Sequence, residues 1–132
     1  MSRKKSNRPT DAELAILRVL WTRGEGTVRE IHEELAAEQS TGYTTVLKLL
    51  QIMHEKGLVE RNESQRAHVY RSAQGQHRTQ RALVSDLLDR AFGGSMSALV
   101  VQALSAKKAS KKEIGEIRRL LDQIEESKGG RS

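Results

Sequence analysis

The segment from residue 40 to residue 61 constrains the fold more than any other part of the chain. Its apolar residues recur three and four positions apart, which is the spacing of one buried helical stripe: Val46, Leu49, Leu50 and Met53. The helix is expected to end at Lys56, because the next residue, Gly57, is a typical C-cap. Two β-prone runs follow at residues 58–61 and 67–71, joined by a polar turn. A helix followed by a two-stranded hairpin is the outline of a winged helix-turn-helix. Alternatively, an ordinary amphipathic helix before a hairpin gives the same local pattern.

The opposite face of this helix carries short hydroxyls, one cation and one amide, which can meet phosphates and base edges in a major groove. Its N-terminal half is the part that enters the groove in helix-turn-helix docking. Arg66 is expected at the tip of the hairpin, against the DNA backbone or minor groove. Alternatively, Thr44 merely caps the helix. The predicted DNA-binding set is Thr41, Tyr43, Thr44, Thr45, Lys48, Gln51, Arg66, His68 and Arg71.

Two further helices are predicted before this one, each opened by a capping box. Thr10 precedes Glu13 by three residues, and Thr27 precedes Glu30 by three. Each box opens an apolar stripe, and the stripes consist of Leu14, Leu17 and Trp21 in the first helix and Val28, Ile31 and Leu35 in the second. Short breaks separate the three helices. Three helices and a hairpin therefore predict a winged-helix domain over residues 9–73.

Composition agrees with a mainly α fold that has a small β-hairpin. With 36% hydrophobic and 3% aromatic residues in 132, the core must consist of Leu, Val, Ile and Ala. The absence of cysteine excludes disulfides, thiol nucleophiles and thiolate metal sites. No apolar run approaches the roughly 20 residues that span a bilayer, and no signal peptide is seen, so we expect a cytoplasmic protein without membrane insertion.

The net charge of +6 favours a polyanionic partner, but residues 1–73 are nearly balanced and form no basic block. A basic, flexible tail is predicted over residues 1–8, where Arg3, Lys4, Lys5 and Arg8 would contact phosphates. Charge therefore supports nucleic-acid binding without deciding it.

From residue 74 the pattern changes to helices without a hairpin. A helix is predicted from about residue 77 to 92, a short one after Ser95 or Ser97, a loop at 105–110, and a last one opened by a capping box at Ser110. A unit this small rarely buries enough apolar surface by itself to be stable. We therefore expect residues 74–127 to form a three-helix dimerisation domain, followed by a flexible tail at 128–132. Alternatively, these helices pack back onto the first domain. The predicted contacts are Val84, Leu87, Leu88, Leu99, Val100, Ile117, Leu121 and Ile124.

Nothing in the chain forms a catalytic constellation. The four histidines are scattered, none stands at a metal-ligand spacing, and there is no phosphate-cradling glycine loop. We therefore expect no enzyme, no cofactor and no metal site.

Several segments together resemble the penicillinase-repressor family of transcriptional repressors. They extend over nearly the whole chain and comprise residues 13–21, 28–31, the run Tyr43-Thr44-Thr45-Val46, residues 50–61 and 66–71, the segment 92–100 with its two glycines, and residues 112–114 with 120–121. The resemblance implies a homodimeric repressor involved in antibiotic response, with an N-terminal winged helix on palindromic double-stranded operator DNA and a C-terminal helical dimerisation domain.

The resemblance also implies induction by proteolysis. In the best-known members of the family a membrane sensor detects a β-lactam, and the repressor is then cut at an Asn-Phe bond in the dimerisation domain. The matching bond here is Gln102-Ala103, where a methyl group replaces the aromatic side chain. The implied partners are a membrane-associated sensor protease or a downstream protease. The cysteine cluster of the copper-responsive branch is missing, so copper sensing is not expected. Two other functions remain open: a winged-helix regulator controlled by a small-molecule ligand, and a winged-helix protein–protein adaptor.

Overall fold

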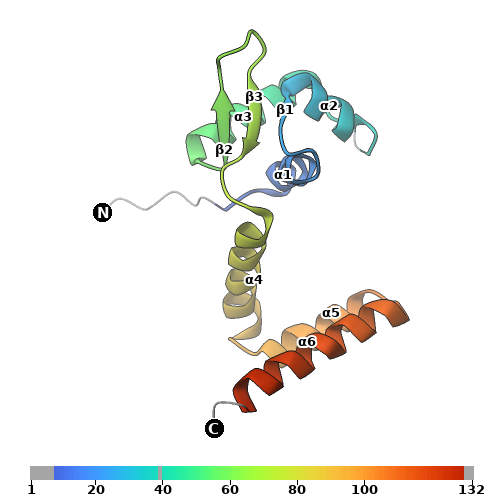
Figure 1. Ribbon diagram of the computed structural model, residues 1–132. Helices are drawn as coiled ribbons and strands as arrows, with labels where there is room; N and C mark the ends of the chain where they lie inside the picture. Colours follow the sequence, from blue (N-terminus) through green and yellow to red (C-terminus); the bar gives the residue numbers. More distant parts are fainter. Residues whose placement is uncertain (1–7, 39, 130–132) are drawn as a thin grey trace. The chain divides into compact units, whose positions relative to one another are not determined.

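The computed structural model describes residues 8–38 and 40–129. Its elements, in chain order, are α1 (Asp11–Arg23), β1 (Gly26–Thr27), α2 (Val28–Ala36), α3 (Tyr43–Lys56), β2 (Val59–Asn62), β3 (Val69–Ser72), α4 (Gln76–Phe92), α5 (Met96–Ala106) and α6 (Lys111–Gly129) (Figure 1). The fold is mainly helical with one small sheet, and it is a winged helix-turn-helix followed by a helical C-terminal part. This confirms the predicted fold class. The predicted tail residues Arg3, Lys4 and Lys5 lie outside the described residues.

Both predicted capping boxes at the start of α1 and α2 are present. The backbone N–H of Glu13 donates to the Thr10 hydroxyl at 3.2 Å, and the Thr10 N–H donates to the Glu13 carboxylate at 2.9 Å. Thr27 and Glu30 make the same pair of bonds at 3.2 Å and 2.9 Å. Two otherwise orphaned backbone donors are satisfied at each helix start, which explains why these helices begin where they do.

α3 ends at Lys56 with Gly57 as its C-cap, as the sequence predicts. Gly57 has a φ of 81°, a left-handed conformation that costs glycine least. The N–H of Leu58 then donates to the Met53 carbonyl at 2.9 Å and turns the chain into β2.

The sheet has three strands, not the two that the sequence predicts. β3 lies between β1 and β2, with Gly26 opposite Tyr70 and Asn62 opposite Val69. The prediction missed β1, because two residues are too short to show any periodicity. Gly26 is buried, and a Cβ there would lie only 3.3 Å from the Ile31 side chain. The backbone at this position therefore packs closely against Ile31, and glycine fits best because it has no side chain.

The core of the winged helix consists of aliphatic side chains from α1, α2 and α3, closed on the sheet side by Val59 and Tyr70. Leu14, Trp21 and Leu49, expected in the buried stripes, are only partly buried and pack against this core. The buried hydrophobic residues of this core are Ile16, Leu17, Val19, Leu20, Val28, Ile31, Leu35, Val46, Leu50, Met53, Val59 and Tyr70.

The chain divides into two compact units, residues 1–84 and 85–132. The first turns of α4 therefore belong to the winged-helix unit, beyond the predicted boundary at residue 73. Ser95 is the N-cap of α5, and the Ser110 hydroxyl accepts the Glu113 N–H at 3.1 Å ahead of α6. α5 extends to Ala106 and α6 to Gly129, so the predicted loop is shorter and the last helix longer than expected. None of the described residues of α4, α5 and α6 is buried.

Candidate nucleic-acid interface

α3 begins differently from α1 and α2. Its N-cap is Gly42, and no side chain in the described residues caps it. Thr44 lies inside the helix and is exposed, so the alternative in which Thr44 is only a cap is excluded. The first-turn N–H groups of α3 therefore have no side-chain acceptor among the described residues, and such groups at a helix N-terminus can bind an anion such as a phosphate.

The exposed face of α3 carries the side chains that the sequence predicts. Thr44, Thr45, Lys48 and Gln51 are all exposed, opposite the buried Val46, Leu50 and Met53. Ile52 adds an apolar group, 41% exposed, one turn beyond Lys48. Glu55 occupies the same face further on, so the part of α3 suited to a polyanion is its N-terminal half.

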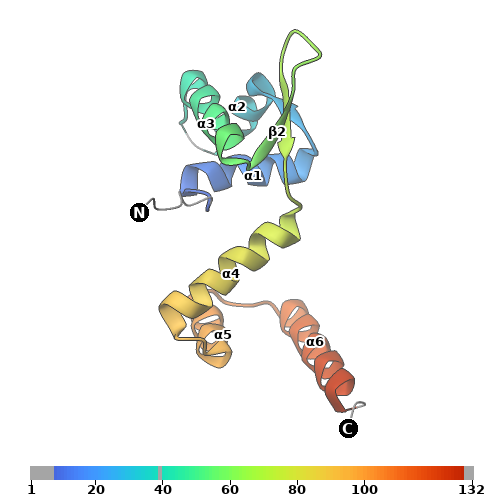
Figure 2. The same cartoon turned by 90° about the vertical axis from the view of Figure 1, so that its left-hand side faces the viewer.

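A groove joins the start of α3 to the wing. It has a volume of about 470 Å³ and is lined by residues of β1, α2, α3, the β2–β3 loop and β3: Thr27, Val28, Arg29, Tyr43, Leu47, Arg66, Ala67, His68 and Tyr70. The loop projects beyond the helices in both views (Figures 1 and 2). Three of the predicted residues, Tyr43, Arg66 and His68, thus meet at one surface although up to 25 positions separate them in the sequence.

The groove also contains a cation that the sequence analysis missed. Arg29, in the first turn of α2, is exposed and lines the same groove as Arg66 of the wing. In the sequence, Arg29 looks like any other exposed residue of an amphipathic helix, so no local pattern indicates a role in binding. Only the sheet, which brings the wing beside the α2 N-terminus, reveals that Arg29 and Arg66 share a surface.

The position of Tyr43 is fixed by an aromatic contact with α2. Its ring meets that of His32 edge-to-face, with centroids 5.9 Å apart and an interplanar angle of 79°. Such pairs stabilise by about 0.5–1.5 kcal/mol beyond the area they bury. Tyr43 remains 47% exposed at the start of α3.

The structure does not bring Arg71 and Thr41 to this groove. Arg71 follows the buried Tyr70 on β3 and therefore points away from the core, where its Nε lies 3.0 Å from the Glu60 carboxylate. Together with Glu25 and Glu63 it lines a separate depression that has three carboxylates. Thr41 is half-buried in the segment before Gly42 and lines another shallow depression.

A second ion pair lies where β2 passes into the β2–β3 loop. Arg61 Nη2 lies 2.6 Å from Glu63 Oε2, and this hydrogen bond lowers the pKa of the Glu63 carboxyl, with smaller contributions from His68 and His54. The Arg61 charge is thus engaged within the hairpin, whereas Arg66 lies exposed near the tip.

The predicted dimer contacts all lie on α4, α5 and α6, and none of the eight is buried. Exposed fractions reach 51% for Val84 and 56% for Leu121, high values for large apolar side chains. Gln102 and Ala103, the predicted cleavage residues, are exposed in the interior of α5.

In the part of the chain that the structure describes, no three His, Asp or Glu side chains are arranged to hold a metal ion. Across the same residues, no helix combines the length and the apolar character needed to cross a membrane.

A family model described as penicillinase repressor matches residues 9–123. The chain belongs to the penicillinase repressor family. It is 36% identical to the transcriptional regulator BlaI of Mycobacterium tuberculosis over 129 residues, which cover 96% of this chain and 92% of the relative. It is 23% identical to a penicillinase repressor of Staphylococcus aureus, covering 86% of this chain and 90% of the relative. It is 19% identical to the methicillin resistance regulatory protein MecI of Mammaliicoccus sciuri, covering 86% and 93%.

Membership of the penicillinase repressor family confirms the resemblance found in the sequence. Members of this family are transcriptional repressors and not enzymes, which confirms the prediction that the chain is not an enzyme.

Proposed function

We propose that the chain is a homodimeric repressor that binds a palindromic operator in cytoplasmic DNA through α3 and the wing. The observation that carries the proposal is the groove in which Tyr43, Arg29 and Arg66 meet beside the uncapped start of α3. The names of the relatives, transcriptional regulator and penicillinase repressor, support the same function.

In this proposal the N-terminal half of α3 enters the major groove. Thr44, Thr45 and Gln51 reach base edges or phosphates, and Lys48 contacts the backbone or a guanine. Ile52 supplies an apolar surface suited to the methyl group of thymine. Arg29 and Arg66, which line the protein groove beside α3, bind phosphates of the DNA backbone, and their charges release condensed counterions.

Dimerisation is proposed to bury the apolar faces of α4, α5 and α6. The exposed Val84, Leu87 and Leu121 would leave water in the dimer, and each apolar Å² removed contributes about 25 cal/mol. A dimer also presents two DNA-binding domains to one operator. Once one domain is bound, the second binds its half-site at a high effective concentration.

Footprinting on DNA upstream of the gene for this chain tests the proposal. We expect two protected half-sites related by a dyad and spaced by about one helical turn or a multiple of it. Protection that ignores sequence, or none at all, would favour the protein–protein adaptor. For variants in which an α3 threonine is replaced by alanine, Thr22→Ala is the matched control, because Thr22 is an exposed threonine on α1 away from the groove.

We further propose that proteolysis at Gln102-Ala103 relieves repression, with a sensor protease or a downstream protease as partner. The cut would separate α6 from α5 and remove the Ile114 and Leu121 side of the proposed dimer surface. Because the bond lies inside a helix, α5 must open locally first, and the protease must accept a methyl side chain at Ala103. Mass spectrometry of the repressor from induced cells decides: full derepression beside an intact 14.8 kDa chain would refute the mechanism.

A further inference from the structure

The β2–β3 loop, residues 63–68, carries the wing side of the proposed DNA surface. Arg66 and His68 line the groove beside α3, and every residue of the loop is exposed. No side chain of the loop therefore enters the core, and the strand pairing ends at Asn62 opposite Val69. An exposed loop with few packed contacts opens easily unless its base is held. The position of Arg66 thus depends on what holds the base of this loop.

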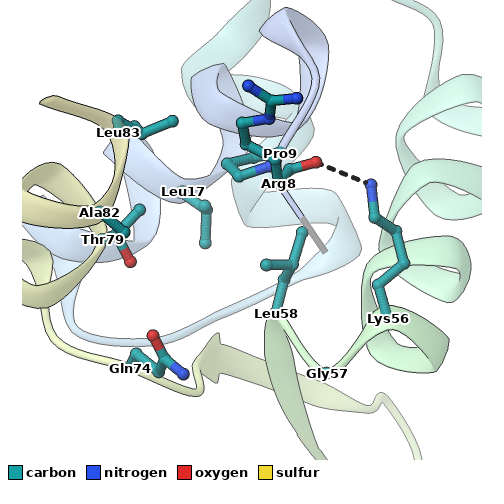
Figure 3. A pocket seen from close by; sticks show the side chains of 10 residues that line it. All are labelled: Arg8, Pro9, Leu17, Lys56, Gly57, Leu58, Gln74, Thr79, Ala82 and Leu83. Atoms are coloured by element: carbon teal, nitrogen blue, oxygen red, sulfur yellow. Dashed lines mark hydrogen bonds between the residues drawn. The ribbon is translucent and has the colours of Figure 1, made fainter. Parts of the chain in front are cut away.

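β2 starts from a well-anchored point. Leu58, just before the strand, is directed into a small cavity beside Leu17 (Figure 3). The Nζ of Lys56, two residues earlier, donates to the Arg8 carbonyl oxygen at 3.2 Å, as the same figure shows. Val59, the first residue of β2, is buried in the core, but no later residue of the strand is buried. The end of β2 that leads into the loop is therefore held by something other than core packing.

Arg61 is a charged side chain on the inward face of β2. Exposure alternates along the strand, so Arg61 shares a face with the buried Val59. The register also puts it directly opposite the buried Tyr70. The Arg61 side chain is only 24% exposed. A cation withdrawn this far from water costs stability unless it is paired and hydrogen-bonded, so its partners indicate why it is there.

The partners of Arg61 connect the core to the loop. Hydrogen bonding to Tyr70, and after it to Glu63, raises the pKa of the Arg61 guanidinium. On the loop side, Nε and Nη2 of Arg61 lie 2.7 Å and 2.6 Å from the same oxygen of Glu63, the first residue of the loop. Beside it, the Asn62 side-chain oxygen accepts the Ser64 N–H at 2.9 Å. Side-chain bonds thus fix the point at which the chain leaves the sheet.

We propose that Arg61 is a positioning residue for the wing, which ties Glu63 to Tyr70 and so holds residues 63–68 in the conformation in which Arg66 faces DNA. This inference rests on the operator binding proposed above. Arg61 acts through Glu63 and makes no phosphate contact of its own. A loop that is ordered before DNA arrives loses less conformational entropy on binding, so the contact of Arg66 contributes more to affinity.

Backbone NMR relaxation of the free full-length chain gives the first test. We expect order parameters for residues 63–68 of about 0.85 in wild type and below about 0.6 in Arg61→Met and Glu63→Ala. Arg71→Met is the matched control, because Arg71 pairs with Glu60 in the same hairpin at 3.0 Å and neither residue belongs to the loop. A loop that is already flexible in wild type, stays rigid in both variants, or loosens equally in Arg71→Met would overturn the proposal.

Operator binding gives the second test. We expect the loss of affinity caused by Arg66→Ala to be at least about threefold smaller in the Arg61→Met and Glu63→Ala backgrounds than in wild type, because residues that act through one network are not additive. Removing the Glu63 charge would by itself favour DNA, so a smaller contribution from Arg66 in that background reports on position. Glu63 is also 54% exposed, so Glu63→Ala tests the same contact even where Arg61→Met lowers the melting temperature.

The two tests separate this inference from the proposed function. Equal losses for Arg66→Ala in all three backgrounds would overturn the positioning role of Arg61 and leave operator binding intact. A wild-type chain that binds no operator would instead contradict the proposed function, and the order parameters of the free chain would still decide whether Arg61 holds the loop.

Discussion

Lys56, at the end of α3, binds the buried carboxylate of Glu13, at the start of α1, with 2.7 Å between Nζ and Oε1. The Glu13 side chain is 3% exposed and that of Lys56 18%, so water screens this pair far less than a surface ion pair. The same carboxylate accepts the Thr10 N–H, so one side chain both starts α1 and holds the end of α3. α3 is thus anchored at its C-terminal end, opposite to its proposed DNA contact.

Removing the lysine should destabilise the protein more than a surface ion pair would. Lys56→Met leaves the Glu13 carboxylate buried without its cation, and we expect a loss of about 3–5 kcal/mol in the free energy of unfolding. The double variant with Glu13→Gln should recover part of the loss, because no unpaired charge remains. Urea unfolding measures both, and a loss below about 1 kcal/mol in Lys56→Met would show that the pair behaves as a surface contact.

The hydroxyls on α3 should matter for DNA and not for folding. Thr44→Ala and Thr45→Ala remove exposed groups, so we expect unchanged melting temperatures and a loss of about 1–3 kcal/mol in operator binding. Thr22→Ala is the control. Unchanged operator affinity in both α3 variants would remove these threonines from the site.

Two arginines in the same hairpin should respond differently to substitution. Arg66→Ala is expected to lower the slope of log affinity against log salt concentration by about 0.9, since one phosphate contact is lost. Arg71→Ala should leave the slope unchanged, because Arg71 is paired with Glu60 on the other side of the wing. Affinities measured over a range of salt concentrations test the pair, and the reverse result would place the DNA on the opposite face.

The C-terminal helices should hold two chains together. Leu121→Glu puts a carboxylate on the apolar face of α6, and burying it in a dimer costs several kcal/mol, so we expect a monomer with collapsed operator binding. Gln123→Glu adds the same charge at an exposed polar position of α6 and is the control. Sedimentation at micromolar concentration measures the state, and a wild-type monomer would refute the dimer.

Glu30 predicts a pH dependence of stability. The hydrogen bond from the backbone N–H of Thr27 lowers the pKa of Glu30 below its usual 4.5, and the nearby Arg23 adds to this, although some burial acts in the opposite direction. Because the folded-state pKa is depressed, the stabilisation is present above pH 4.5 and is lost as pH falls through the folded-state value. Glu30→Gln should therefore be less stable than wild type at pH 7 and nearly equal to it at pH 3, as measured by urea unfolding. A constant difference across this range would mean that the ionised carboxylate contributes nothing.

Most of the local structure follows from the residues themselves. Capping boxes at Thr10 and Thr27, a left-handed glycine at Gly57 and helical apolar spacing are local signals, and each one marks its element correctly. β1 and the role of Arg29 depend on residues far apart in the sequence that meet only in the folded chain. The opposite orientation of Arg71 follows from strand register, which a one-residue shift reverses, and the sequence leaves that register open.

β3 is the central strand of the sheet, hydrogen-bonded on one side to β2 and on the other to β1, which leads directly into α2. The strands of the wing are therefore tied to the helices through β1, and the β2–β3 loop that carries Arg66 extends beyond them. If α3 and the wing bind one operator as proposed, these ties limit how far the two can move apart, and the DNA would deform to fit them. The energy of that deformation depends on base steps that the protein never touches, and such a repressor would discriminate between operators partly by their stiffness.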